Sequence, residues 1–239
     1  MCGRYTLKTP PDQWGQFLLP IMEASSSDSW KSGEWKPRYN IAPTQDVIAV
    51  ARPAEGAPSM DYFRWGLVPT WAKELSVGNR MINARSETVH EKRSFSGPFQ
   101  KQRCLVIADG YYEWQKLKSG EKQACWIAPA GDEVLCLAGL WESNRRAVGE
   151  EVRSCTILTT AANDQLAEIH DRMPVVLSKQ AAEMWLDPNS PAEDLRQLMG
   201  AAEDGFFQVR KVGRFVNNAR NEGEECLERV DEEAKDEDE

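Results

Sequence analysis

Short apolar segments dominate the middle of the chain. They are rich in β-branched and aromatic residues and are separated by Gly, Asp or Lys, which is typical of strands. The predicted strands are DVIAVAR (46–52), MDYFRWG (60–66), RCLVIADGYYEWQK (103–116), QACWIAPA (123–130), EVLCLAGLW (133–141) and VRSCTILTTAA (152–162). FFQVRKVGRFVNN at 206–218 predicts one further strand. This part of the chain therefore predicts a sheet protein.

Helical patterns occur at both ends of the predicted sheet. Apolar residues at helical spacing predict a helix over 10–22, followed by a Ser-rich surface loop at 24–36. Two later helices are predicted from their capping residues, SKQAAEMWL with Ser178 as N-cap and SPAEDLRQLM with Ser190 as N-cap. We find no internal repeat and no linker within 1–221, so the sequence predicts a single α+β domain built largely on antiparallel sheet.

The charge is unevenly distributed along the chain. The formal net charge is −9, from 38 acidic and 29 basic residues. Residues 222–239 hold eleven acidic and two basic residues, so residues 1–221 hold 27 of each and are neutral. Such an acidic block is typical of a solvated tail, which we place at 228–239, after a domain over 1–227. A cationic groove on the neutral body is therefore compatible with the overall charge.

Composition excludes several classes of protein. With 41% apolar residues the chain is typical of a globular protein, and no apolar run reaches the roughly 20 residues of a membrane span. We therefore expect a soluble, intracellular protein. The six cysteines form no CxxC pair, so we expect neither a zinc site nor another cofactor. Four of them, at 104, 125, 136 and 155, lie in apolar runs and are expected to be buried.

The residue at position 2 carries distinctive chemistry. Removal of Met1 would leave Cys2 with an α-amine and a thiol on adjacent carbons. An α-amine has a pKa of about 7.7 to 8, so part of it is a neutral nucleophile at physiological pH. It can attack an aldehyde, and the thiol can then close a five-membered thiazolidine on the imine. A cysteine after Met1 is also an ordinary N-terminus, so this residue alone does not establish a function.

Four further residues are candidates for a site. Asn83 and Arg85 are two apart and would share one face of a strand. Glu113 lies between Tyr112 and Trp114, and apolar surroundings would raise its pKa, although a solvent-facing strand position is the alternative. His170, one of two histidines, is either a catalytic base or a structural hydrogen-bonding residue. His90, the other, is expected on the surface of a helical segment.

Seven fragments resemble one family, in order along the chain. They are MCGRY at the N-terminus, RYNIAPTQ (38–45), WGLVPTW (65–71), INARSET (82–88), ADGYYEW (108–114), IHDRMPV (169–175) and VNNARN (216–221). Together they resemble the SOS response-associated peptidase (SRAP) family, which includes abasic-site shielding proteins. The resemblance covers residues 2 to about 227 and implies the barrel-like SRAP fold with flanking helices.

The resemblance implies specific catalytic roles. It implies that Cys2 crosslinks to the ring-opened aldehyde of an abasic site, that Asn83 positions the N-terminus, that Glu113 transfers protons and that His170 assists ring opening. The implied partner is single-stranded DNA that contains abasic sites, bound by a monomer with crosslinking and lyase-like activity. The implied location is the cytoplasm, at the nucleoid in a bacterium, or the nucleus in a eukaryote.

The resemblance also implies a DNA-binding surface. Arg4, Arg85 and Arg172 match family arginines that hold the DNA backbone, and ordinary surface ion pairing is the alternative. Pro43 and Trp71 resemble residues that abut the bases beside the lesion. Some relatives have two adjacent tryptophans there, whereas Trp71 is followed by Ala72, which predicts a weaker wedge.

Two other functions fit the same residues. Cys2 could serve an autocatalytic or general thiol peptidase with His170 or Glu113 as base, although the sequence identifies no oxyanion hole. A noncovalent module that binds single-stranded DNA would need the arginines and aromatic residues but not Cys2. A Cys2-dependent adduct that survives heat and denaturant would separate the three.

Overall fold

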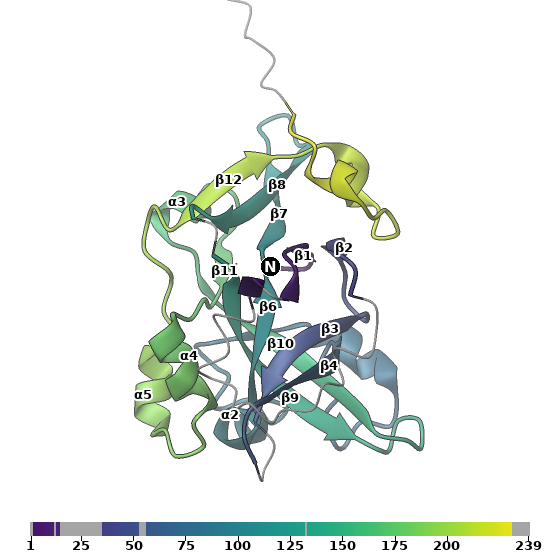
Figure 1. Ribbon diagram of the computed structural model, residues 1–239, viewed down its shortest axis with the longest axis vertical. Helices are drawn as coiled ribbons and strands as arrows, with labels where there is room; N and C mark the ends of the chain where they lie inside the picture. Colours follow the sequence, from purple (N-terminus) through teal and green to yellow (C-terminus); the bar gives the residue numbers. More distant parts are fainter. Residues whose placement is uncertain (1, 12, 15–34, 53–55, 132, 231–239) are drawn as a thin grey trace, which may run out of the picture.

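The computed structural model describes residues 2–11, 13–14, 35–52, 56–131 and 133–230 (Figure 1). They form an α+β fold with two sheets, as the sequence predicted. One sheet has the order β12-β8-β7-β1-β2. Its strands are β1 (Tyr5–Leu7), β2 (Arg38–Ile41), β7 (Gly110–Lys116), β8 (Lys122–Pro129) and β12 (Phe207–Lys211).

The second sheet closes on itself. Its strands are β3 (Asp46–Ala51), β4 (Ser59–Trp65), β5 (Asn83–Arg85), β6 (Arg103–Ala108), β9 (Leu135–Asn144), β10 (Val152–Ala161) and β11 (Arg172–Pro174). The pairings β10–β4, β4–β3, β3–β6, β6–β9 and β9–β10 complete a ring of five strands, visible in the lower half of Figure 1. Most pairings are antiparallel, and those of β10 with β4 and β5 are parallel. The ring is the barrel-like core expected from the sequence.

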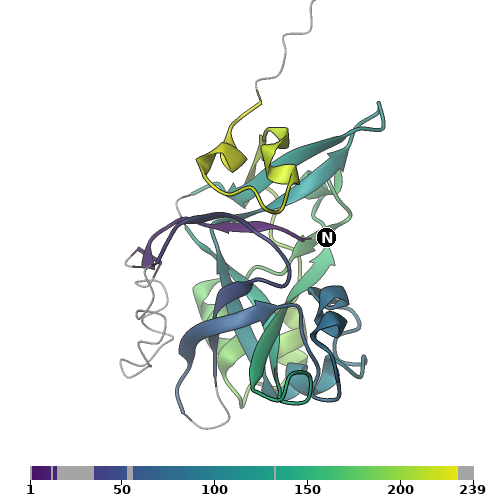
Figure 2. The ribbon, with the colours of Figure 1, turned by 90° about the vertical axis from the view of Figure 1, so that its right-hand side faces the viewer.

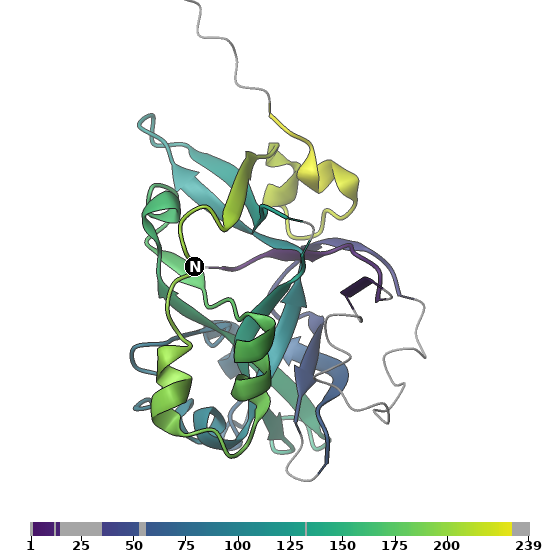
Figure 3. The same cartoon turned by 60° about the vertical axis from the view of Figure 1, so that its left-hand side comes forward.

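Strand β10 extends beyond the ring and carries two short strands on its edges. β5 pairs with Ile157–Thr159 of β10, and β11 pairs with Thr159–Ala161. Asn83 on β5 and Arg172 on β11 are therefore held at the same end of β10. This end lies close to the start of the chain, as Figures 1 and 3 show.

The long segment 103–116 forms two strands, which belong to different sheets. The chain turns at Asp109, whose carboxylate accepts hydrogen bonds from the backbone N–H groups of Lys8 and Thr9. The next residue must be glycine, because a Cβ on Gly110 would lie 2.8 Å from the Trp126 indole. This turn moves the chain from the ring to the five-stranded sheet and brings β7 beside β1.

Helices and short 3₁₀ turns flank the sheets. They are η2 (Leu75–Arg80), α2 (Ser96–Lys101), α3 (Asp164–Ala167), α4 (Lys179–Leu186), α5 (Ala192–Gln197), η3 (Arg214–Asn217) and η4 (Glu224–Leu227). α4 and α5 lie on one side of the ring (Figure 3). Buried Arg103 ties α4 to β6 by donating to the carbonyls of Trp185 and Asp187. No helix among the described residues is long and apolar enough to cross a membrane.

Several local predictions can be compared with this structure. Ser178 caps α4, as predicted, by accepting from the N–H of Ala181. Ser190 does not cap α5, because its hydroxyl donates to the Met184 carbonyl and the N-cap is Pro191. Most of the helix predicted over 10–22 and most of the loop at 24–36 lie outside the described residues.

Two further segments differ from the predictions. The strand predicted over 206–218 ends at Lys211, and Arg214–Asn217 is a 3₁₀ turn. His90 lies in consecutive turns rather than a helix and is half-buried. The four cysteines expected in the core, at 104, 125, 136 and 155, are each at most 1% exposed, as predicted.

The start of the predicted acidic tail pairs with the end of β12 and the residues after it. Gly213 donates to the Glu228 carbonyl, and Val230 donates to the Lys211 carbonyl. Residues 228–230, which the charge pattern placed in the tail, are thus hydrogen-bonded to the body. Residues 231–239 lie outside the described residues. A truncation that keeps these hydrogen bonds must therefore retain residue 230.

The loop that carries Trp71 is held by a close approach of two glycines. Gly66 has φ +121°, and a Cβ there would lie 2.6 Å from the Gly78 carbonyl oxygen. Beyond Gly66, Val68 donates to the Ser154 hydroxyl, and Asn144 donates to the Ala72 carbonyl. These contacts fix both ends of the loop, which is shown from the side in Figure 2.

We therefore expect Gly66→Ala to lower the free energy of unfolding by about 1 to 3 kcal/mol, because it adds backbone strain and a clash with Gly78. Urea unfolding at neutral pH measures this change. Gly97→Ala in α2 is the control, since a Cβ there meets nothing within 4 Å and alanine favours a helix. An unchanged midpoint for Gly66→Ala would contradict the account.

Candidate active site

Cys2 lies buried at the start of the first strand. The chain from Cys2 runs into β1, which pairs with β7. The backbone N–H of Tyr112 on β7 donates to the Arg4 carbonyl at 2.9 Å. Cys2 is fully buried, and the Asn83 amide donates to its carbonyl oxygen at 2.7 Å. The backbone of Cys2 is thus held by a side chain from β5. The role of Asn83 as positioning residue remains a prediction, with this contact in its favour.

Glu113 is buried on β7 next to Cys2. It is 3% exposed, so the alternative of a solvent-facing strand position is wrong. Burial raises the pKa of its carboxyl, and the positive charges of the N-terminal amine and His170 act in the opposite direction. Burial also raises the pKa of the Cys2 thiol, and the negative charge of Glu113 raises it further. Burial therefore shifts both groups towards their protonated forms.

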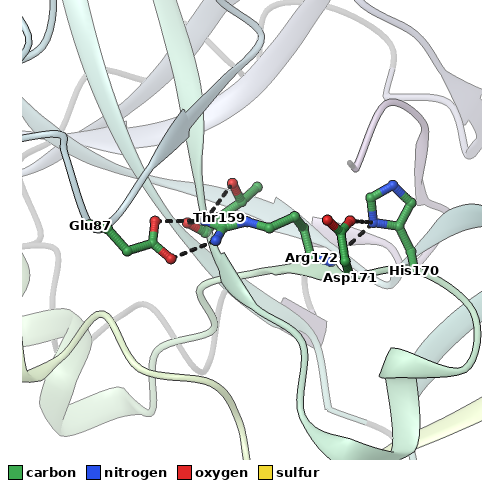
Figure 4. A network of polar contacts seen from close by, with 5 residues as sticks. All are labelled: Glu87, Thr159, His170, Asp171 and Arg172. Atoms are coloured by element: carbon green, nitrogen blue, oxygen red, sulfur yellow. Dashed lines mark hydrogen bonds and ion pairs between the residues drawn. The ribbon is translucent and has the colours of Figure 1, made fainter.

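His170 stands between α3 and β11, and its Nδ1 edge is occupied. Nδ1 accepts a hydrogen bond from the backbone N–H of Arg172 at 3.0 Å and lies 2.8 Å from Oδ1 of Asp171 (Figure 4). An acceptor role for Nδ1 places the proton of the neutral ring on Nε2. The ring is half-buried, and its charge acts on Glu113. His170 is therefore oriented to exchange a proton through Nε2.

Arg172 is already paired in this structure. Its guanidinium donates to both carboxylate oxygens of Glu87, at 2.5 and 2.9 Å, and to the Thr159 carbonyl at 2.5 Å (Figure 4). The hydrogen bonds to Arg172 lower the pKa of Glu87. The side chain of Arg172 is only 12% exposed. Within the described structure, the guanidinium group that was expected to bind a phosphate binds the carboxylate of Glu87 instead.

Arg4 is also engaged within the fold. Its guanidinium donates to Asn40 Oδ1 and the Val216 carbonyl, both at 2.8 Å, and lies 5.6 Å from the centre of the Trp114 ring. These contacts join β1 to the segment around η3. Arg85, in contrast, is exposed at the end of β5. Arg85 is therefore the most accessible of the three arginines that the sequence proposed for DNA.

The two residues proposed to abut bases lie on loops. Trp71 is 43% exposed after β4, and Pro43 is half-buried between β2 and β3. The turn after Pro43 is fixed by Thr44, which has φ +74° and donates to the Trp65 carbonyl at the end of β4. An exposed indole on an anchored loop is suited to stacking on an unpaired base.

The structure brings Cys2, Asn83, Glu113 and His170 into one site, through contacts from β1, β5, β7 and the α3–β11 connection. It also reveals three residues that the sequence did not single out: Tyr111, Glu87 and Thr159. The Tyr111 hydroxyl and Asn83 Oδ1 are buried without a hydrogen-bond partner in the described structure, and the negative charges of Cys2 and Glu113 act on Tyr111. Glu87 could have been suspected from its place in INARSET. No group of three metal-ligating side chains is found among the described residues.

Comparisons with known proteins place the chain in a family. The family model described as SOS response associated peptidase (SRAP) matches residues 1–219. Abasic site processing protein YoqW of Bacillus subtilis (strain 168) is 35% identical over 231 residues, covering 95% of this chain and 99% of YoqW. Abasic site processing protein HMCES of Gallus gallus is 34% identical, covering 82% of this chain and 67% of HMCES.

A solved structure supports the fold. A protein from Bacteroides thetaiotaomicron superposes with a TM-score of 0.82 at 21% identity, covering 96% of this chain and 100% of that chain. This likeness extends over both sheets, so the arrangement of strands described above is shared across distant sequences.

The burial of Glu113 predicts a pH-dependent cost in stability. Below about pH 4.5 the carboxyl is neutral in both states, whereas at higher pH the unfolded chain ionises first and is favoured. The stability advantage of Glu113→Gln should therefore grow with pH, by up to about 1.4 kcal/mol per unit, until the pH passes the raised pKa of Glu113.

Urea unfolding between pH 4.5 and 8 measures this difference. Glu150→Gln, which replaces an exposed carboxyl, serves as the control. Its free energy of unfolding should differ from that of the parent protein by the same amount at every pH. If the difference in free energy of unfolding between Glu113→Gln and the parent protein is also independent of pH, the pKa of Glu113 is not raised by folding.

Proposed function

Since the chain belongs to the SOS response-associated peptidase (SRAP) family, we propose that it processes abasic sites in single-stranded DNA by forming a covalent thiazolidine crosslink through Cys2. The observation that carries the proposal is the convergence of Asn83, Glu113 and His170 on the N-terminal cysteine. The names of the curated relatives support abasic-site processing as the general activity.

The reaction requires removal of Met1. While Met1 is attached, the nitrogen of Cys2 is part of a peptide bond and is not a nucleophile. Excision creates an α-amine that is neutral in part at physiological pH. The hydrogen bond from Asn83 holds the Cys2 carbonyl, and the buried Asn83 Oδ1 is a suitable acceptor for the new amine. The amine is thereby directed before the DNA arrives.

The amine and the thiol act in sequence. The amine adds to the aldehyde carbon of the ring-opened deoxyribose and gives a carbinolamine, which loses water to form an imine. The thiol sulfur then adds to the imine carbon and its proton passes to the nitrogen, which closes the thiazolidine. One water is released in total. Because burial raises the pKa of the Cys2 thiol, sulfur remains protonated until the imine has formed.

Glu113 and His170 supply the proton transfers. A carboxyl with a raised pKa can protonate the departing hydroxyl of the carbinolamine and take a proton back from the nitrogen as the neutral imine forms. His170 can pass a proton from Nε2 to the deoxyribose ring oxygen and so assist ring opening, since Nδ1 accepts the backbone N–H of Arg172. The same groups would catalyse the reverse reaction.

DNA contacts outside the reacting atoms come from exposed side chains. Trp71 would stack on an unpaired base, which contributes roughly 1 to 3 kcal/mol and favours a single strand. Arg85 would contact phosphate. Peptidase activity is less compatible with this site, because a thiol nucleophile must be a thiolate and burial disfavours that form at Cys2.

The first test replaces the thiol. Cys2→Ala keeps the α-amine after Met1 removal but lacks the sulfur that closes the ring. It should bind single-stranded DNA as the parent protein does and form an imine that borohydride traps. Its adduct should not survive heat and denaturant without borohydride. Denaturing gels of protein incubated with an oligonucleotide containing one abasic site measure this, with intact mass confirming removal of Met1.

Cys226→Ala, which removes a buried thiol from the smaller apolar cluster, is the control and should crosslink normally. A heat-stable adduct from Cys2→Ala would refute the thiazolidine, and loss of DNA binding along with the adduct would point to a structural defect.

The second test removes proton transfer and keeps the shape of the side chain. Glu113→Gln should slow crosslinking or its reversal by roughly 10²- to 10⁴-fold, as expected when general acid–base catalysis is removed. Single-turnover rates with saturating DNA between pH 5 and 8 measure this. Glu150→Gln, which removes an exposed carboxyl, is the control and should react at the parent rate. Equal rates for Glu113→Gln and the parent at every pH would make Glu113 a structural residue.

A further inference from the structure

A groove lies on the face of the five-stranded sheet that carries Glu113. In the strand register Glu113 is directly opposite Cys125 on β8, and Cys125 is directly opposite Lys211 on β12. Residues paired in this way present their side chains on one face of a sheet. Glu113, Cys125 and Lys211 therefore form a row that runs from the active site to the edge strand, over roughly 10 Å at the usual strand spacing.

Two residues that line the groove, Gln115 and Glu168, are each two positions from a residue of the candidate active site. Gln115 follows Glu113 by two residues on the same face of β7, and its amide donates to the Glu168 carbonyl at 3.1 Å. Glu168 precedes His170 by two residues. Gln115 and Glu168 line the near end of the groove, whereas Lys211 and Arg229 line it further out. Figure 1 shows β12 and β8 continuing outward from β7, with α3 beside them.

The lining is cationic. Among the described residues it includes Arg210, Lys211 and Arg229, against the single carboxylate of Glu168. Arg210 lies over the Trp126 ring at 5.1 Å, whereas Lys211 and Arg229 are exposed. The backbone of Arg229 is held beside β12, because Arg229 bridges to Val212 and Val230 donates to the Lys211 carbonyl. Two exposed cations are thus fixed on paired backbone.

The body of the protein has no net positive charge to attract DNA from a distance. Local cations beside the reacting centre therefore gain importance for binding a polyanion.

We propose that the groove along β8 and β12 binds the sugar-phosphate backbone of nucleotides on one side of the abasic site, with Lys211 and Arg229 contacting phosphates. The proposal rests on the proposed function, because its ligand is the strand that reacts at Cys2. The groove would set on which side of the lesion the protein needs flanking nucleotides.

The experiment measures binding apart from chemistry. Single strands carrying a tetrahydrofuran abasic analogue have no aldehyde and cannot crosslink. One strand places the analogue near its 5′ end and the other near its 3′ end, so that only one long flank is present in each. Dissociation constants are measured at several salt concentrations for the parent protein and for Lys211→Gln, Arg229→Gln and the double variant.

Each single variant should weaken binding several-fold for one of the two strands only. For that strand the slope of log K against log salt should become shallower by about 0.7 for each phosphate that is no longer neutralised, and by about 1.4 in the double variant. Lys122→Gln is the matched control: it is an exposed lysine on β8 whose side chain faces the other side of the sheet, and it should change neither quantity. With saturating DNA that contains a true abasic site, Lys122→Gln should crosslink at the parent rate.

Unchanged affinity and salt slope for both strands would overturn the groove proposal while leaving the crosslinking function intact. Equal weakening for both strands would also overturn it, since the effect would then be general electrostatic attraction. If the parent protein forms no crosslink, the proposed function is wrong. Binding of the tetrahydrofuran strands would still show separately whether the groove contacts phosphates on one side of the lesion.

Discussion

The site depends on the pairing of the first strand with β7. An N-terminal segment is ordinarily free to move, and fixing each backbone residue costs about 1 to 2 kcal/mol of conformational entropy. Here β1 lies between β7 and β2, and Arg4 and Asn83 add side-chain hydrogen bonds at either side of Cys2. The backbone carbonyls of Cys2 and Arg4 are therefore held by hydrogen bonds from β5 and β7. In the proposed reaction, the nucleophile at Cys2 would gain from this pairing the preorganisation that enzymes otherwise obtain from a side chain on a rigid element.

The same pairing determines the protonation of the site. Glu113 is buried next to Cys2, and burial penalises the charged carboxylate, so the pKa of the carboxyl is raised. Burial raises the pKa of the Cys2 thiol for the same reason. In the proposed reaction, a carboxyl whose pKa is raised would be suited to protonating a leaving hydroxyl. Excision of Met1 then matters electrostatically as well as chemically, because it places the ammonium or amine of Cys2 itself within reach of the carboxyl.

The sequence predicted the strands of the ring, the class of the fold and the buried cysteines, because these depend on local apolar patterns. It left Glu113 open between an exposed and a buried position, since alternation along one strand does not reveal which face another strand covers. The turn at Asp109, which splits one apolar run between two sheets, depends on contacts with Lys8 and Thr9 about 100 residues away. The pairing of Arg172 with Glu87 is equally nonlocal, so a motif that suggests phosphate binding cannot reveal the carboxylate that occupies it.

The Glu87 pair changes what Arg172 can contribute to DNA affinity. A phosphate that replaced Glu87 would exchange one bidentate charge-assisted contact for another, and the displaced carboxylate would be left beside the DNA. The net gain in binding free energy would therefore be small. The backbone of Arg172 has a separate role, because its N–H fixes the Nδ1 edge of His170, and the anchored guanidinium keeps that backbone in place. In the proposed reaction, Arg172 would therefore act chiefly through His170 rather than through a direct contact with phosphate.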